Sequence, residues 1–262
     1  MCLLAIAFQK HSDAPLVVMS NRDEFYARPT RSLHWWDDAP ILAGRDEQAG
    51  GTWMGLSRKG HFAAVTNYRH GSNGQSPEAK PLSRGHLVSG FLNSGQSATA
   101  WVNELRPTMA DYGGFNLLIF DGTDLVYLNN YNQDKPENLL PGVYALSNNL
   151  LDSAWPKVDY ARQKLQQAID KNTPMGKKQV HQLMGDLSLQ KTYPEDLLPN
   201  TGVPPEWEKV LSSPFIIAEA YGTRASSVVI VSASGKVNVV ERRFDDGRMV
   251  GEIGIGFKVS DI

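Results

Sequence analysis

The residues best suited to chemistry stand at the start of the chain. Cys2 is the only cysteine, and a small second residue such as cysteine generally permits removal of Met1. The new terminus would carry a thiol and a free amine on one residue. A thiolate is a strong nucleophile, and an α-amine with a pKa of about 8 can take its proton at neutral pH. We therefore expect Met1 to be removed and Cys2 to be the nucleophile of an N-terminal-nucleophile arrangement.

The segment after Cys2 is predicted to form a hairpin. The apolar run over residues 2–8 is typical of a buried strand. A second apolar run over residues 16–20 is its expected partner, joined through residues 11–15. An antiparallel partner would carry the polar residues that follow it back to the start of the first strand.

Those polar residues are of the types that build catalytic sites. Arg22 would lower the pKa of the Cys2 thiol, and Asp23 could hold the ammonium or orient the amine. We assign Arg22 and Asp23 to catalysis, and Asn21 and Glu24 to ligand binding. Because side chains alternate along a strand, Asn21 with Asp23 and Arg22 with Glu24 should lie on opposite faces. The alternative is a structural cysteine beside a polar hairpin end.

Further polar residues stand at or inside other apolar strands. Asn67 ends one strand, Asn148 follows another, Asn116 lies within a third and Arg224 precedes a fourth. Asparagine amides can donate to an oxyanion without adding charge, and an arginine can anchor a carboxylate. We assign Asn67, Asn148 and Arg224 to catalysis, and Tyr68 and Asn116 to ligand binding. Asparagine is also a common turn residue, which is the alternative for each.

The order of the predicted elements indicates an α+β fold. Strands come first, helices dominate the middle, and strands return at the end, without the strand–helix alternation of a parallel sheet. No break in composition marks a linker, so residues 1–262 are expected to form a single domain. Helices are predicted over residues 83–92, 97–105, 156–171 and 176–187, and further strands over residues 41–44, 52–57, 61–66, 115–120, 125–128, 143–146, 226–231, 236–241 and 251–258.

Two details of these elements can also be predicted. Ser83 and Ser97 are plausible caps of the first two helices, and residues 71–77 form a loop by composition. The third helix carries one apolar stripe, made of Val158, Ala161, Leu165 and Ile169.

Composition excludes several classes of protein. The 41% apolar content supports a substantial core, while the net charge of −2 and the scattered basic residues argue against nucleic-acid binding. No apolar stretch approaches the roughly 18 residues of a membrane span. The chain start lacks a basic leader, and one cysteine cannot form an internal disulfide, so a cytoplasmic location is expected. The spacing of the six histidines predicts no metal site, and no cofactor is expected.

The combined motifs resemble the NRDE family, also called the transport and Golgi organisation protein 2 family. The resemblance covers nearly the whole chain and implies the αββα sandwich of N-terminal-nucleophile hydrolases. It also implies proposed roles in haem trafficking and in acyl-coenzyme A or lipid metabolism. The motifs are Met1-Cys2, Asn21-Arg-Asp-Glu24, Gly51-Thr-Trp-Met-Gly-Leu-Ser57, Thr66-Asn-Tyr68, Gly114-Phe-Asn116, Leu146-Ser-Asn148 and Tyr221-Gly-Thr-Arg224.

A more remote resemblance is to the bile salt hydrolase and penicillin V acylase group. Cys2 is similar to the nucleophile of that group, Asn67 and Asn148 to its two asparagines, and Arg224 to its late arginine. Those hydrolases carry Arg-Asn-x-Asp on the second strand, whereas this chain carries Asn-Arg-Asp-Glu. The register of the arginine and the acid relative to Cys2 therefore stays open.

Two functions of different classes follow. The first is an N-terminal-nucleophile hydrolase-like protein that cleaves a linear amide or acyl bond with Cys2. The second is a non-enzymatic protein that carries haem or an acyl-coenzyme A or lipid ligand. The chain has no haem-attachment motif, and a small-molecule partner is expected in both cases.

Overall fold

The structure is a computed structural model that describes residues 2–69, 80–131 and 136–259. The chain divides into two compact units, each made of segments that are distant in sequence. Unit 1 comprises Met1–Ala27, Arg69–Ser76 and Pro141–Phe257, and unit 2 comprises Arg28–Tyr68, Pro77–Leu140 and Lys258–Ile262. The single domain expected over residues 1–262 stays a prediction. The loop expected over residues 71–77 lies outside the described residues.

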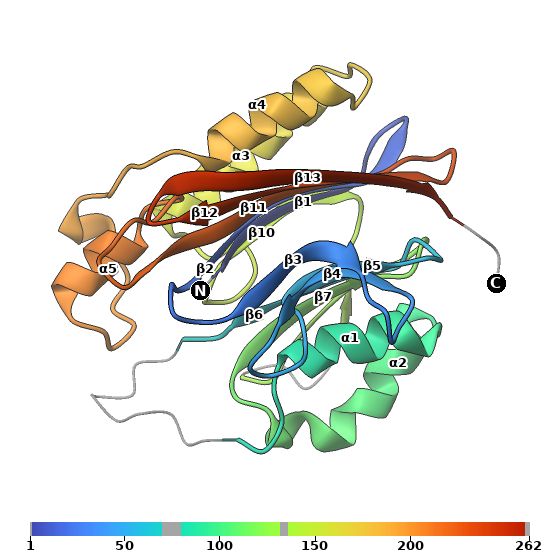
Figure 1. The fold of residues 1–262 in the computed structure, drawn as a ribbon, viewed down its shortest axis with the longest axis horizontal. Helices are drawn as coiled ribbons and strands as arrows, with labels where there is room; N and C mark the ends of the chain where they lie inside the picture. The colour runs from blue at the N-terminus through green and yellow to red at the C-terminus, as the bar shows by residue number, and fades with distance from the viewer. Residues whose placement is uncertain (1, 70–79, 132–135, 260–262) are drawn as a thin grey trace. The chain divides into compact units, whose positions relative to one another are not determined.

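Unit 1 is built on a six-stranded sheet with the strand order β10-β1-β2-β11-β12-β13 (Figure 1). The first hairpin lies inside this order, and most residues of its two strands are buried, in agreement with their apolar sequences. The strands are β1 (Cys2–His11), β2 (Ala14–Phe25), β10 (Gly142–Leu146), β11 (Tyr221–Val231), β12 (Lys236–Asp245) and β13 (Arg248–Lys258).

The predicted hairpin is confirmed, but its strands are longer than their apolar runs. β1 continues to His11 and β2 begins at Ala14, so Pro15 lies inside the strand rather than in the connection. The pairing register shifts between Phe8 and His11, where Gln9 has a φ of 50°. Polar residues can therefore follow this bulge within the same strand, whereas the apolar pattern alone predicts that the strand ends at Phe8.

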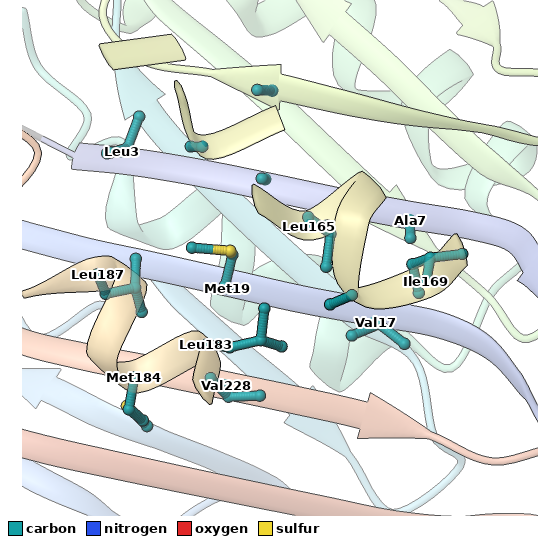
Figure 2. Packing of buried hydrophobic residues seen from close by; sticks show 14 of the residues in the cluster. Leu3, Ala7, Val17, Met19, Leu165, Ile169, Leu183, Met184, Leu187 and Val228 are labelled. Atoms are coloured by element: carbon teal, nitrogen blue, oxygen red, sulfur yellow. The ribbon is translucent and has the colours of Figure 1, made fainter. Parts of the chain in front are cut away.

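The helices α3 (Pro156–Asp170) and α4 (Lys177–Leu187) pack on one face of this sheet. The predicted apolar stripe of α3 is confirmed, because Val158, Ala161, Leu165 and Ile169 are all buried in the core between helix and sheet. Figure 2 shows the contact: side chains of both helices reach those of β1, β2 and β11, among them Leu3, Ala7, Val17, Met19, Leu165, Leu183, Leu187 and Val228.

Unit 2 holds a seven-stranded sheet in the order β3-β4-β5-β6-β7-β8-β9. The helices α1 (Gly85–Ser94) and α2 (Ala98–Leu105) cover one face of it, and their buried side chains form a second core with those of the strands (Figure 1). The strands are β3 (Thr30–Trp35), β4 (Ile41–Asp46), β5 (Met54–Ser57), β6 (Phe62–Asn67), β7 (Phe115–Phe120), β8 (Leu125–Asn129) and β9 (Glu137–Asn138).

Most predicted elements are present, and the α+β class is confirmed. Ser97 caps α2 as expected, because its side chain accepts a hydrogen bond from the backbone N–H of Ala100. The expected cap at Ser83 is wrong, since α1 starts later and Arg84 occupies the N-cap without a side-chain bond. The strand β3 and the short helix α5 (Pro205–Leu211) were not expected, because neither has a sustained apolar periodicity.

Candidate functional site

Cys2 is the first residue of β1 and lies directly opposite Arg22 of β2. The next pair along the strands is Leu3 with Asn21, and Leu3 belongs to the core under α3 and α4. Directly opposed residues of an antiparallel pair extend their side chains to the same face. The half-buried thiol and the buried guanidinium therefore share the sheet face that points away from these helices.

The sequence left open how the arginine and the acid are placed relative to Cys2. The pairing of the strands shows that Arg22 is the residue opposite Cys2. Its guanidinium Nη2 lies 3.8 Å from Oε2 of Glu24, which is two residues along the same strand. Glu24 also accepts a hydrogen bond from the backbone N–H of Phe25 at 2.9 Å. The predicted alternation is confirmed, because Arg22 and Glu24 interact on one face while their neighbours bond on the other.

Asn21 points to the helix-covered face and is fully buried. Its Nδ2 donates to the backbone oxygens of Leu187 and Pro214, both at 2.8 Å, and its Oδ1 accepts from Ser226 Oγ at 2.6 Å. Both amide hydrogens are used on carbonyls of the protein itself. The ligand-binding role expected for Asn21 therefore has no support in the structure, which gives this side chain the task of tying β2 to α4 and β11.

Asp23 is buried on the same face as Asn21 and takes part in a network with β11. Its Oδ1 accepts from Thr223 Oγ1 at 2.7 Å, and its backbone oxygen accepts from Tyr221 Oη at 2.9 Å. Burial raises the pKa of Asp23, while the ammonium of Lys157 and the bond from Thr223 act in the opposite direction. Asp23 is therefore a desolvated acid that depends on neighbouring donors and cations to hold a negative charge.

Asn148 follows β10, which pairs with β1 on the side away from β2. The last registered pair of β1 and β10 is Leu4 with Leu146, where β10 ends, and Asn148 follows two residues later. Ser147 Oγ donates to the backbone oxygen of Cys2 at 3.0 Å, which ties the segment to β1. Asn148 is buried, and its backbone oxygen accepts from the N–H of Arg69 at 2.7 Å. The segment that carries Asn148 is thus held near the start of β1, and the oxyanion-donor role of Asn148 stays a prediction.

Arg224 occupies a bulge in β11. Thr223 pairs with Asp23 and Ala225 pairs with Arg22, so Arg224 is the extra residue between them. Its Nη1 donates to the backbone oxygen of Tyr26 at 2.6 Å, and to that of the preceding residue at 3.1 Å. The side chain fastens the end of β2, and its catalytic role stays a prediction.

The acidity of the Cys2 thiol is set by burial and by the charges around it. Burial raises the pKa of Cys2, and the carboxylates of Asp23 and Glu24 act in the same direction. Arg22 does lower the pKa of the thiol, as expected, but its effect is smaller than that of burial. The N-terminal ammonium lowers the pKa of the thiol as well, so the expected direction of both positive charges is confirmed, while burial outweighs them and leaves the pKa of Cys2 raised.

Lys157 is a member of this cluster that the sequence analysis missed. It is 2% exposed at the start of α3, and its Nζ donates to the backbone oxygen of Leu211 at 2.7 Å. Burial lowers its pKa to about 8, while Asp23 and Cys2 both favour the charged ammonium. The signal was present in the spacing, because Lys157 continues the buried stripe of Ala161 and Leu165 at intervals of four residues.

The remaining predicted site residues belong to unit 2. Asn67 ends β6, and Tyr68 stacks on Tyr131 with ring centroids 4.1 Å apart. Asn116 is fully buried; its Nδ2 donates to Thr66 Oγ1 at 3.2 Å and its Oδ1 accepts from Tyr127 Oη at 2.8 Å. These bonds give Asn116 a structural role across β6, β7 and β8. The catalytic role expected for Asn67 and the ligand-binding roles expected for Tyr68 and Asn116 stay predictions.

Two further findings concern the residues that the structure describes. Among them, no three His, Cys, Asp or Glu side chains come together in a way that could hold a metal ion. Within the same residues, none of the helices combines the length and the apolar character that crossing a membrane requires.

Comparison with known proteins shows which family the chain belongs to. The family model described as Transport and Golgi organisation 2 matches residues 1–246. The chain belongs to the Transport and Golgi organisation 2 family. It is 33% identical over 245 residues to a Transport and Golgi organization 2 homolog of Mus musculus, covering 88% of this chain and 87% of that protein. It is 30% identical over 245 residues to the Homo sapiens homolog, with the same two coverages.

The fold of this family member is also found in a solved hydrolase. A mutant of the conjugated bile acid hydrolase from Clostridium perfringens superposes with a TM-score of 0.50 at 10% identity, covering 99% of this chain and 97% of that one. At such low identity the likeness concerns the fold alone. The predicted fold class, α+β of the N-terminal-nucleophile hydrolase type, is thereby confirmed.

In this Transport and Golgi organisation 2 protein, the unit 1 site joins three strands and one helix around Cys2. Arg22 lies opposite Cys2, Ser147 ties the segment of Asn148 to the Cys2 backbone, and the buried charges of Asp23 and Lys157 interact with each other and with Cys2. A nucleophile, an amide donor and a buried carboxylate are the parts that acyl transfer requires. The arrangement can support attack on a carbonyl, provided that a base removes the thiol proton.

Proposed function

We propose that this protein is a cysteine hydrolase of the N-terminal-nucleophile type that cleaves a linear amide or related acyl bond of a small molecule. The observation that carries the proposal is the register of β1 and β2, which sets Cys2 opposite Arg22. A purely structural cysteine at the start of an apolar strand would not require a buried arginine, a buried acid and a buried asparagine nearby. Here these residues are Arg22, Asp23 and Asn148. Such residues cost free energy when buried and are retained most often where they act.

The proposed reaction begins with removal of Met1. The freed α-amine takes the proton from Cys2 Sγ, and the thiolate attacks the carbonyl carbon of the substrate. A C–S bond forms, and the oxyanion accepts a hydrogen bond from Asn148 Nδ2. The C–N bond then breaks, and the amine passes the proton to the leaving nitrogen. Water hydrolyses the thioester, which releases the acid and restores the thiol.

The buried charges around Cys2 suit this sequence of steps. Asp23 would accept a hydrogen bond from the terminal ammonium that forms when the thiol loses its proton. Arg22 would favour the thiolate, and so would offset the desolvation that raises the pKa of the thiol. Arg224 would hold the end of β2 in place through its bonds to the backbone of Phe25 and Tyr26.

Intact mass and turnover test the proposal together. The mass of protein isolated from cells should correspond to loss of Met1. Processed protein should hydrolyse at least one member of a panel of N-acyl amides and acyl-thioesters, and Cys2→Ala should abolish that turnover. A mass that retains Met1, or turnover that persists in Cys2→Ala, would overturn the mechanism.

The second candidate is a carrier of haem or of an acyl-coenzyme A or lipid ligand, with haem as cargo rather than a cofactor. It predicts no turnover by processed protein, together with tight binding that survives Cys2→Ala. A visible spectrum during haem titration and calorimetry with acyl-coenzyme A measure that binding. Binding without turnover would replace the hydrolase proposal with the carrier.

A further inference from the structure

The six-stranded sheet of unit 1 ends in a long strand with an open edge. β13, drawn in red in Figure 1, is the last strand of the order, and among the described residues it pairs with β12 alone. None of its eleven residues is buried, whereas β11, inside the same sheet, is buried at all but one position. From Arg248 to Gly256, no backbone hydrogen bond to a loop or turn is found within the described chain. Such an edge offers its backbone N–H and C=O groups to another strand.

The other sheet edges in the described chain are short or irregular. β10 has five residues and β9 has two, while β3 has six and a register shift between Arg31 and His34. Short and bulged edges are usual protections against unwanted strand pairing. β13 is long and contains no proline, and its residues 253–257 read Ile-Gly-Ile-Gly-Phe without a charge. This edge is therefore the one best suited to accept a further strand.

The sequence of β13 complements itself about Ile255. When a second copy pairs antiparallel around a two-fold axis at Ile255, Glu252 lies opposite Lys258 and Ile253 lies opposite Phe257. Opposed residues of an antiparallel pair extend their side chains to the same face, so each carboxylate meets an ammonium and each branched chain meets an aromatic ring. Both kinds of pair stabilise a sheet, and the symmetry provides each of them twice.

The charges of β13 favour this register over the neighbouring ones. An axis at Glu252 would set two Glu252 carboxylates against each other, and an axis at Ile253 would set Arg248 opposite Lys258. Like charges directly opposite each other destabilise strand pairing. An axis at Gly254 would leave Glu252 and Lys258 opposite uncharged residues, so it would gain nothing from either charge.

Both charged side chains are accessible to a partner. Glu252 Oε2 accepts a hydrogen bond from Arg242 Nε at 2.6 Å, yet the Glu252 side chain is 48% exposed. A carboxylate can accept several hydrogen bonds, so the contact with Arg242 leaves capacity for an ammonium. Lys258 is the last residue of β13 and is exposed.

We propose that β13 is a dimer interface, at which two copies of the chain join their six-stranded sheets edge to edge. The strands pair antiparallel over residues 252–258, with the two-fold axis at Ile255. A strand from a different protein would require no such symmetry in β13, which is why the second copy is the partner of choice. Because the pairing uses β13 of both copies, assembly stops at two.

Sedimentation of the full chain over the micromolar concentration range tests the interface. Monomer should convert to dimer as concentration rises, with no larger species. Lys258→Glu places an acidic side chain opposite Glu252 twice in each dimer and should raise the dissociation constant roughly tenfold. The double variant Glu252→Lys with Lys258→Glu exchanges the two charges and should restore dimerisation. Lys10→Glu is the matched control, because Lys10 is an exposed lysine of β1, inside the strand order.

Single-cysteine variants test the register. In a Cys2→Ala background, Ile255→Cys should lie opposite its own copy, with Cα atoms about 5 Å apart, which a disulfide can bridge. Ile253→Cys is the matched control, because the same residue type on the same face would lie roughly 14 Å from its copy, beyond disulfide reach. Mild oxidation followed by a non-reducing gel should show a covalent dimer for Ile255→Cys and none for Ile253→Cys.

A chain that stays monomeric throughout the micromolar range would overturn the inference. A dimer whose dissociation constant is unchanged by Lys258→Glu, or a species larger than a dimer, would overturn it as well. Equal oxidation of Ile253→Cys and Ile255→Cys would exclude the register about Ile255. The charge exchange leaves Ile255 intact, so it decides the matter if Ile255→Cys does not fold. None of these measurements depends on whether Cys2 is catalytic.

Discussion

Cys2 and Arg22 face each other across the antiparallel pair of β1 and β2, at the start of β1, where Ser147 is bonded to the Cys2 backbone. The relationship places a permanent positive charge next to the thiol. It does not by itself create a thiolate, because burial raises the pKa of Cys2 by more than Arg22 lowers it. The acidity of the thiol therefore depends on the balance between burial, which raises its pKa, and the positive charges of the N-terminal ammonium and Arg22, which lower it.

The first prediction concerns thiol reactivity in the chain that retains Met1. Alkylation of Cys2 by iodoacetamide should be slower at neutral pH than that of a free-cysteine peptide. The rate should continue to rise at pH values where the peptide has reached its plateau, because a raised pKa leaves less thiolate at each pH. The measurement is the alkylation rate as a function of pH.

Arg22→Met provides the matching test of electrostatics. It removes the charge that favours the thiolate, so the midpoint of the rate profile should move to still higher pH. Arg28→Met is the control, because Arg28 pairs with Asp46 in unit 2. A Cys2 midpoint below that of the peptide would contradict the dominance of burial.

The second prediction concerns Asn148. Asn148→Ala should lower turnover of any acyl substrate on the order of 10²-fold, as loss of one oxyanion donor typically does. The neighbouring Asn149→Ala is the control, since Asn149 Oδ1 accepts a local hydrogen bond from the backbone of Leu150. Steady-state kinetics of both variants, compared with their unfolding midpoints, separates the two roles. A loss of stability with unchanged turnover in Asn148→Ala would mean that Asn148 is a structural turn residue.

The third prediction concerns the pH dependence of stability through Lys157. Its pKa is about 8 in the folded chain and 10.5 ordinarily, so the unfolded chain binds more protons between these values. The free energy of unfolding should therefore gain a contribution as pH rises through this window, at most about 3 kcal/mol, which is the shift multiplied by 1.36 kcal/mol per pKa unit.

Lys157→Met should remove this pH-dependent contribution. It should also be less stable than the wild type, because it leaves buried Asp23 without the cation that most favours its charge and the carbonyl of Leu211 without its donor. Lys164→Met, on the same helix but one-third exposed and paired with Asp186, should keep the pH dependence of the wild type. Urea unfolding at several pH values measures the difference. Identical slopes for Lys157→Met and the wild type would show that Lys157 is not buried as a charged group.

The fourth prediction concerns Asn21, which the structure makes a structural residue. Asn21→Ala leaves the carbonyls of Leu187 and Pro214 without their donor, in a fully buried position. The free energy of unfolding should fall by roughly 2–4 kcal/mol, the cost of a few buried unsatisfied groups. Turnover or ligand affinity of the folded fraction should not change.

Asn238→Ala is a suitable control for Asn21→Ala. Asn238 is a half-buried strand residue of β12, and no side-chain hydrogen bond of it is found within the described part of the chain. Its substitution should change the free energy of unfolding by no more than about 0.5 kcal/mol. If Asn21→Ala abolished ligand binding while leaving stability intact, the original ligand-binding assignment would be restored.

The sequence by itself determined the elements that carry the site. Apolar runs and the stripe of α3 are local patterns, and local patterns are readable because they follow the periods of strand and helix. The alternation of Asn21, Arg22, Asp23 and Glu24 between two faces followed from the same rule. The motifs were sufficient to assign the family.

Only the tertiary structure decided which of these residues act together. The pairing of Cys2 with Arg22 depends on a register set by the whole hairpin, and the approach of Lys157 to Asp23 joins residues far apart in the chain. The role of Asn21 was decided by carbonyls from α4 and from the segment before β11. The pKa of the Cys2 thiol depends on burial, which is a property of the packed chain and not of the residues next to Cys2 in the sequence.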